Sequence, residues 1–270
     1  MRKKEAMSNF SCRFKDQVRL NFDISKEAYI QFEQKHAFYG KLTNQLVDHV
    51  FQKGLVPSGW EQQKLRILDV GCGIGNSSMK LQELFPNADI FGLDLSSEML
   101  EAAKERCPGI DFVCGDGEKL LDYFEAGGFD LVIYPASLFI LPNQEESLRQ
   151  ARELLKEGGI VAASVIQGMR DKDNTQINAL AGIPGIVRNE KLNHCLEELF
   201  ANVITSLIQV PMPRDVLRDI YAIPALLAGL FPKFSPQDRS TKLEALIAEV
   251  KERNLELLQE WLLIAAIKRK

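Results

Sequence analysis

Residues 67–75, with the sequence ILDVGCGIG, decide the fold of this 270-residue chain. A short, mostly apolar run leads directly into three glycines at alternate positions, and a helical pattern follows from about Asn76. Glycine backbones turn sharply and approach ligands closely, while the first turn of a helix offers unpaired N–H groups. The stretch therefore predicts a buried strand, a ligand-binding loop and a helix.

From Lys64 onward, short apolar runs alternate with helical stretches. This alternation is typical of a parallel β-sheet whose strands are connected by crossover helices. We expect strands at residues 66–70, 89–93, 110–113, 131–135 and 160–166, and helices that begin near Asn76, Ser97, Glu118 and Asn143. Ser96 or Ser97 would cap the second of these helices, and Gly158-Gly159 would end the fourth.

Helical patterns flank this alternating core. Apolar residues recur at three- or four-residue steps over residues 25–53, which predicts a helix, whereas residues 1–20 show no period and predict a flexible start. After the fifth strand we expect an irregular stretch to Asn189, a helix to about Phe200, a strand at 203–210, helices at 214–231 and 236–259, and a final strand at 261–267.

Composition narrows the classes of function. The chain has 46% hydrophobic and 26% charged residues and a net charge of -4, so a nucleic-acid backbone is not expected as its partner. The five cysteines form no CxxC pair and the histidines have no ligand spacing, so we predict neither a disulfide framework nor a metal site. No apolar segment reaches signal-peptide or membrane-span length, which favours a cytoplasmic protein without stable membrane insertion.

An acidic residue ends the second expected strand. Asp94 follows Gly75 by nineteen residues, where a carboxylate can accept hydrogen bonds from both ribose hydroxyls of a nucleoside cofactor. Capping of the next helix is the alternative role for Asp94. Only Ile74 separates Gly73 from Gly75, whereas the dinucleotide-binding fingerprint has two residues between its second and third glycines. The carboxylate of Asp69 would repel a diphosphate but would suit a ligand that carries an ammonium group. The pattern therefore favours a nucleoside ligand other than a dinucleotide.

Residues 21–166 resemble the class I S-adenosylmethionine-dependent methyltransferases, most closely the small-molecule branch that includes the quinone- and biotin-pathway enzymes. The resemblance implies an α/β fold with a Rossmann-like seven-stranded sheet, mostly parallel with an antiparallel last strand, an N-terminal helical cap and a helical insertion before the last strand. It implies one methyltransferase domain over 21–270, divided into a cap at 21–59, a cofactor-binding core at 60–166, and a C-terminal part at 167–270 with a helical lid at about 214–259.

The resemblance also assigns S-adenosylmethionine as the cofactor. Asp69, Gly71 and Gly73 would hold its methionine part and Asp94 its ribose, while Asp116, in the segment CGDGE at 114–118, would contact the adenine amino group. The full set of expected cofactor-binding residues is Tyr29, Asp69, Gly71, Cys72, Gly73, Asp94, Leu95, Met99, Asp116, Gly117 and Tyr134.

Methyl transfer from a sulfonium is an in-line displacement, for which a protein mainly aligns and desolvates the reactants. A general base is optional, and His36 and Tyr134 are the candidates, with a surface or core role as the alternative. We hypothesise that Tyr29 and Phe32 form part of a lid, and that the acceptor pocket is lined by Tyr134, Ser137 and Phe139. Ordinary core packing is the alternative for all five aromatic and polar residues.

The sequence predicts an S-adenosylmethionine-dependent methyltransferase that acts on a small, partly apolar metabolite. An RNA or protein acceptor and a protein that senses the cofactor without turnover are the alternatives. The acidic balance disfavours RNA, and the segment YPAS at 134–137 lacks the Asn-Pro-Pro-Tyr-like element of amino-directed nucleic-acid enzymes. The apolar stretch 214–231 would roof the acceptor pocket, with homodimer formation or membrane contact as the alternatives.

Overall fold

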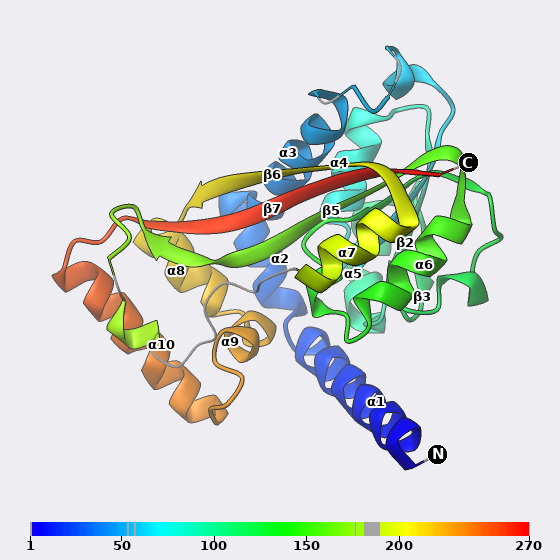
Figure 1. Ribbon diagram of the computed structural model, residues 1–270. Helices are drawn as coiled ribbons and strands as arrows, with labels where there is room; N and C mark the ends of the chain where they lie inside the picture. The colour runs from blue at the N-terminus through cyan, green and yellow to red at the C-terminus, as the bar shows by residue number, and fades with distance from the viewer. Residues whose placement is uncertain (1, 53, 57, 176, 181–189, 270) are drawn as a thin grey trace.

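The computed structural model describes residues 2–52, 54–56, 58–175, 177–180 and 190–269. These residues form a seven-stranded sheet with the strand order β3-β2-β1-β4-β5-β7-β6 (Figure 1). The strands are β1 (Arg66–Val70), β2 (Asp89–Asp94), β3 (Asp111–Cys114), β4 (Phe129–Tyr134), β5 (Leu155–Asp171), β6 (Phe200–Pro211) and β7 (Leu257–Lys268). β7 runs antiparallel to both of its neighbours, β5 and β6, whereas the pairs formed by β1 to β5 are parallel. The predicted fold class is confirmed.

Helices surround this sheet. They are α1 (Arg2–Asp23), α2 (Lys26–His36), α3 (Phe38–Gln52), α4 (Asn76–Leu84), α5 (Ser97–Arg106), α6 (Gln144–Leu154), α7 (Glu190–Leu199), α8 (Arg214–Tyr221), α9 (Pro224–Leu230) and α10 (Pro236–Glu252). Short 3-10 turns are η1 (Trp60–Gln62), η2 (Leu120–Asp122), η3 (Leu138–Ile140) and η4 (Asn178–Leu180). No helix of the described residues is long and apolar enough to cross a membrane.

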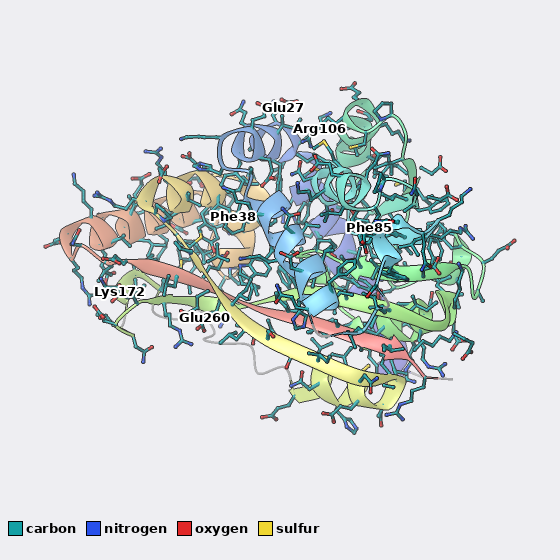
Figure 2. The ribbon with its side chains drawn as sticks, turned by 90° about the horizontal axis from the view of Figure 1, so that it is seen from above. Glu27, Phe38, Phe85, Arg106, Lys172 and Glu260 are labelled. Atoms are coloured by element: carbon teal, nitrogen blue, oxygen red, sulfur yellow. The ribbon has the colours of Figure 1, made fainter. Side chains whose placement is uncertain are left out.

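The strands are buried on both faces because side chains point alternately to opposite sides of a sheet. In β4, Leu131 and Ile133 pack with residues of α3 and α4, whereas Val132 and Tyr134 pack with residues of α6 and α7. Figure 2 shows Phe38, at the start of α3, on the same side of the sheet as Phe85, which follows α4. The sheet thus forms the middle of three layers, and its strand ends remain available for a ligand.

Helix α1 occupies the segment that we expected to be flexible. Phe14, Val18 and Phe22 recur every four residues and therefore share one face of this helix. The frequent charges between them hid this period in the sequence. Helix α1 packs against α5 and α9, beside which it lies in Figure 1.

Several predicted helix boundaries were wrong. Glu118 does not begin an α-helix, since the short connection between β3 and β4 contains only η2. Helix α6 ends at Leu154, so Gly158, with a φ of 75°, turns the chain after the helix has already ended. Helix α10 ends at Glu252 instead of near residue 259, because the chain turns through Asn254, with a φ of 48°, into a longer β7.

Two predicted helical stretches are divided. Residues 25–53 contain α2 and α3, separated at Ala37, which has a φ of 47°. Residues 214–231 contain α8 and α9, and the chain breaks between them because Pro224 begins the second helix. The stretch that we expected to be irregular after residue 166 is β-strand as far as Asp171, and residues 181–189 lie outside the described part of the chain.

Candidate active site

A cavity lies at the carboxyl ends of the parallel strands β1 to β4, where open α/β sheets bind ligands. The residues that follow these strands form its floor, and α1, α2, α3 and α9 add side chains from outside the sheet. The cavity brings together many of the residues predicted from the sequence, namely Tyr29, Gly71, Cys72, Gly73, Asp94, Leu95, Met99, Asp116, Gly117, Ser137 and Phe139.

The glycine loop after β1 requires its glycines. Gly71, Gly73 and Gly75 have φ values of 75°, 53° and 82°, a backbone region that disfavours other residues. A Cβ atom on Gly71 would lie 2.4 Å from Cβ of Ser137, whereas a Cβ atom on Gly73 would meet no atom within 4 Å. Gly71 N–H donates to the carbonyl of Leu93 at 2.7 Å, which fixes the loop against the end of β2.

Asp94 is held in the cavity wall by backbone donors. Its Oδ2 accepts a hydrogen bond from Gly73 N at 2.8 Å, and its Oδ1 accepts one from Ser96 N at 2.9 Å. Burial raises the pKa of the Asp94 carboxyl. Each carboxylate oxygen can accept a further hydrogen bond, so the side chain can receive a diol. Helix α5 is capped by Ser96, whose Oγ accepts from Met99 N, as predicted, so Asp94 is not needed as its cap.

Asp69 lies beneath the loop and is fully buried, outside the cavity lining. Its Oδ2 accepts hydrogen bonds from the hydroxyls of Ser77 and Ser78, both at 2.6 Å. Its Oδ1 has no hydrogen-bond partner among the described residues. Burial raises the pKa of Asp69 to about 6, since removal from water disfavours the charged form. A hydrogen-bond donor from a ligand or a water molecule would satisfy this unpaired Oδ1.

Asp116 is paired with the N-terminal helix. Lys15 Nζ lies 2.7 Å from Asp116 Oδ2 and also contacts Glu118, whose Oε1 accepts from Asn143 N at 2.6 Å. Lys15 lines the cavity together with Phe14, Val18, Arg19 and Phe22 of the same helix. Sequence analysis missed these residues, although the four-residue spacing of their apolar members was a usable signal.

The cavity cover that we expected from residues 214–259 comes mainly from α1. Among the described residues of 214–259, Leu226 alone lines the cavity, while α1 contributes five side chains. Helices α8 and α10 instead bury residues such as Leu217 and Leu246 in the core between themselves and the sheet. The segment 214–231 is apolar over much of its circumference because most of it is core.

Two candidate catalytic residues lie away from the cavity. Tyr134 is fully buried on the α6 side of the sheet, and its hydroxyl lies 2.9 Å from Ser147 Oγ. His36 Nε2 lies 3.0 Å from Asp219 Oδ2, which joins α2 to α8. Phe32, expected in a lid, packs against the rings of His36 and Phe38. None of the three lines the cavity, so its geometry does not support the catalytic and cofactor roles predicted for Tyr134, the catalytic role of His36 or the lid role of Phe32.

Comparison with known proteins agrees with this architecture. Residues 67–159, which contain the glycine loop, Asp94 and Asp116, match the model of a methyltransferase domain family. These residues of the chain therefore form a methyltransferase domain. Trans-aconitate 2-methyltransferase of Deinococcus radiodurans is 34% identical over 42% of this chain and 41% of its own length. The enzyme of the same name from Afipia carboxidovorans is 27% identical over 65% of this chain and 62% of its own.

The similarity therefore spans less than two thirds of these curated relatives. Among solved structures, phosphoethanolamine N-methyltransferase 2 of Haemonchus contortus in complex with S-adenosyl-L-methionine has a TM-score of 0.55 at 19% identity, over 84% of this chain and 53% of that chain. The [4+2]-cyclase SpnF also has a TM-score of 0.55, at 18% identity, over 85% of this chain and 80% of its own. At these identities the likeness shows the fold alone.

Proposed function

We propose that the protein binds S-adenosylmethionine in the cavity and transfers its methyl group to a small, partly apolar acceptor. The observation that carries this proposal is that the glycine loop, Asp94 and Asp116 line one cavity at the carboxyl edge of the sheet. The match of residues 67–159 to a methyltransferase domain covers all three features. The enzymes named trans-aconitate 2-methyltransferase supply a precedent for a small acceptor.

The residues present fit the chemistry of this cofactor, which would supply an electrophilic methyl group on a sulfonium. Asp94 would accept the two ribose hydroxyls, and Asp116 would accept the adenine amino group. Backbone N–H groups of the loop and the guanidinium of Arg19, which lines the cavity, suit the methionine carboxylate. The orphaned Oδ1 of Asp69 suits the ammonium group through a water molecule.

The chain's own contribution to the reaction would be alignment and exclusion of water. Phe14, Phe22 and Phe139 provide apolar surface in the cavity wall, to which α1 contributes five side chains. A dry site strengthens the attraction between a sulfonium and the surrounding carboxylates, and holding two reactants in line removes much of the entropic barrier. With Tyr134 and His36 remote from the cavity, we propose that no general base of this chain is needed for transfer.

Turnover with labelled cofactor tests this proposal. The protein would be incubated with methyl-labelled S-adenosylmethionine and, separately, with a metabolite extract, total RNA and total protein from one cell lysate. We expect label in the metabolite fraction and none in the same fraction with Asp94→Ala protein. Label only in RNA or protein would replace the small-molecule acceptor. Tight cofactor binding without any labelled product would favour the sensing role.

We further propose that the protein forms a homodimer through its edge strand β6. We also propose that it is located in the cytoplasm. Among the described strands, β6 pairs only with β7, and residues 200–211 contain no charged residue that would block pairing with another chain. The five free cysteines support a reducing compartment. Sedimentation should give a dimer that Leu207→Lys, at a side chain 55% exposed, converts to monomer. A monomeric parent protein would contradict the pairing.

A further inference from the structure

Both cationic side chains among the described residues that line the cavity are already paired. Among the described residues, the lining contains the cations Lys15 and Arg19 and the carboxylates Asp94 and Asp116. Lys15 contacts Asp116, and Arg19 Nη1 lies 2.9 Å from Asp23 Oδ2. The proposed function commits Arg19 to the methionine carboxylate of the cofactor, so a carboxylate-bearing acceptor would find no uncommitted cation among the described lining residues and would lie near Asp94 and Asp116. The charged side chains that line the cavity therefore disfavour an anionic acceptor.

The matched methyltransferase domain leaves the N-terminal side of the cavity uncovered. The matched methyltransferase domain, residues 67–159, holds the glycine loop and both cavity carboxylates. The side chains of α1, α2 and α3 that line the cavity precede this domain in the chain. The match of this domain therefore gives no reason to assign to this chain the tricarboxylate acceptor that the relatives' name denotes.

An aromatic wall with two hydroxyls faces the cavity from these helices. The rings of Phe22 and Tyr29 are stacked, with centroids 6.0 Å apart and planes at 20°, and those of Tyr29 and Tyr39 lie 5.9 Å apart. All three residues line the cavity, as does Thr43 one turn beyond Tyr39. The phenol groups of Tyr29 and Tyr39 lie close enough for each to influence the pKa of the other. The wall formed by these rings therefore carries two neighbouring hydroxyls.

This hydroxyl pair can donate one hydrogen bond to a ligand. Burial raises the pKa of both Tyr29 and Tyr39, so both phenols keep their protons at neutral pH. Each phenol carries one O–H, so the pair can offer a hydrogen-bond donor to a ligand oxygen. A neutral donor in an apolar wall orients an uncharged ligand and discriminates against one that leaves the donor unpaired.

We propose that the methyl acceptor is an uncharged molecule with an apolar body and a hydrogen-bond-accepting oxygen, which the Tyr29–Tyr39 hydroxyl pair positions, and that polycarboxylates are excluded. This inference rests on the proposed function and deepens it, because it names the class of acceptor. Tyr29 and Tyr39 are positioning residues in this account, since their phenols remain neutral.

Binding of matched probes to the protein loaded with S-adenosylhomocysteine tests the inference. The probes are 4-ethylphenol, uncharged at pH 7, and 4-ethylbenzoate and trans-aconitate, both anionic. We expect 4-ethylphenol to bind at least about tenfold more tightly than either anion, which corresponds to about 1.4 kcal/mol. In Tyr39→Phe protein, which keeps the ring, its affinity should fall about tenfold while that for S-adenosylhomocysteine stays unchanged. Tyr221→Phe, whose hydroxyl bonds to Gln259 outside the cavity lining, is the matched control and should change neither affinity.

Each other outcome counts against the inference or against its premise. Equal or tighter binding of 4-ethylbenzoate or trans-aconitate would overturn it, and so would absence of binding by all three probes to the loaded protein. Loss of S-adenosylhomocysteine affinity in Tyr39→Phe would assign the hydroxyl pair to the cofactor and overturn its role toward the acceptor. Failure of the parent protein to bind S-adenosylhomocysteine would instead remove the proposed function.

Discussion

Lys15 Nζ lies 2.7 Å from Asp116 Oδ2, so the N-terminal helix is joined to the carboxylate that we propose for the adenine amino group. At the C-terminal end of the helix, the Ser96 hydroxyl donates to Asp23 Oδ1 at 2.6 Å. Helix α1 is thus anchored beside the cavity near its middle and at its C-terminal end, with Val18 and Phe22 between these anchors. We expect α1 to move when a ligand as large as a nucleoside cofactor enters or leaves the cavity.

Loss of the Lys15 anchor should loosen the cover. In Lys15→Met, the carboxylates of Asp116 and Glu118 lose their shared partner, and we expect S-adenosylhomocysteine to dissociate about tenfold faster, in line with the ~1.5–3 kcal/mol of a charged hydrogen bond. Amide hydrogen exchange in α1 should rise in parallel. Lys35→Met removes an exposed pair with Asp219 and serves as the control. An unchanged dissociation rate in Lys15→Met would show that α1 is not the gate.

The glycine loop allows a comparison of two alanine variants. Gly71→Ala would place a Cβ atom against Ser137 in addition to its unfavourable positive φ, whereas Gly73→Ala has only the backbone cost, about 1–2 kcal/mol. We expect Gly71→Ala to lower the free energy of unfolding, measured in urea, by at least about 1 kcal/mol more than Gly73→Ala, because overpacking adds to the strain. Equal losses would mean that Ser137 moves away at little cost.

The raised pKa of Asp69 gives a pH-dependent prediction. The folded protein, with a pKa of about 6 at this carboxyl, holds the proton more tightly than the unfolded chain, whose aspartates titrate near ~3.9. Protonation of Asp69 therefore stabilises the fold at low pH, and this contribution is lost as the pH rises from about 4 through 6. Asp69→Asn should gain stability relative to the parent between pH 4.5 and 7.5, on the order of 1 kcal/mol in urea unfolding.

The same ionisation should govern cofactor affinity with the opposite sign. An ionised Asp69 favours a ligand ammonium group, so affinity for S-adenosylhomocysteine should weaken as the pH falls below about 6 in the parent but not in Asp69→Asn. Asp89→Asn, at an exposed aspartate at the start of β2, controls for general charge effects. A parent affinity that is flat between pH 5 and 8 would separate Asp69 from the ligand.

Tyr134→Phe should affect stability and leave the site intact. The substitution removes the hydrogen bond between the Tyr134 hydroxyl and Ser147 in the core on the α6 side, which costs about 1 kcal/mol. Methyl transfer and cofactor affinity should equal those of the parent. A large fall in turnover with an unchanged melting temperature would restore Tyr134 to the site.

Local patterns in the sequence were sufficient to predict the core of the fold. The run from Ile67 to Gly75 encodes a buried strand, positive-φ turns and a helix start within nine residues, and Asp94 stands at a fixed distance from it. The side of the sheet on which the Tyr134 side chain lies could not be predicted. A strand that is buried on both faces lacks the alternation of polar and apolar residues that would distinguish the two faces.

Contacts between distant segments account for the other omissions. The Lys15–Asp116 pair joins residues 101 positions apart, and no pattern within α1 specifies its partner. No pattern in the sequence distinguishes Tyr39 from the other aromatic residues of the N-terminal helices. Only the fold places it against Tyr29 and in the cavity lining. Leu226 likewise lines the cavity only because α9 packs beside α1.

Calorimetric titration with S-adenosylhomocysteine, S-adenosylmethionine and NAD tests the central claim most directly, on the parent and on Asp94→Ala and Asp89→Ala. The two aspartates stand at opposite ends of β2, and only Asp94 lines the cavity. The account predicts micromolar binding of the two adenosyl compounds, retained in Asp89→Ala and lost in Asp94→Ala, with no binding of NAD. Binding of NAD alone, or adenosyl affinity unchanged in Asp94→Ala, would contradict it.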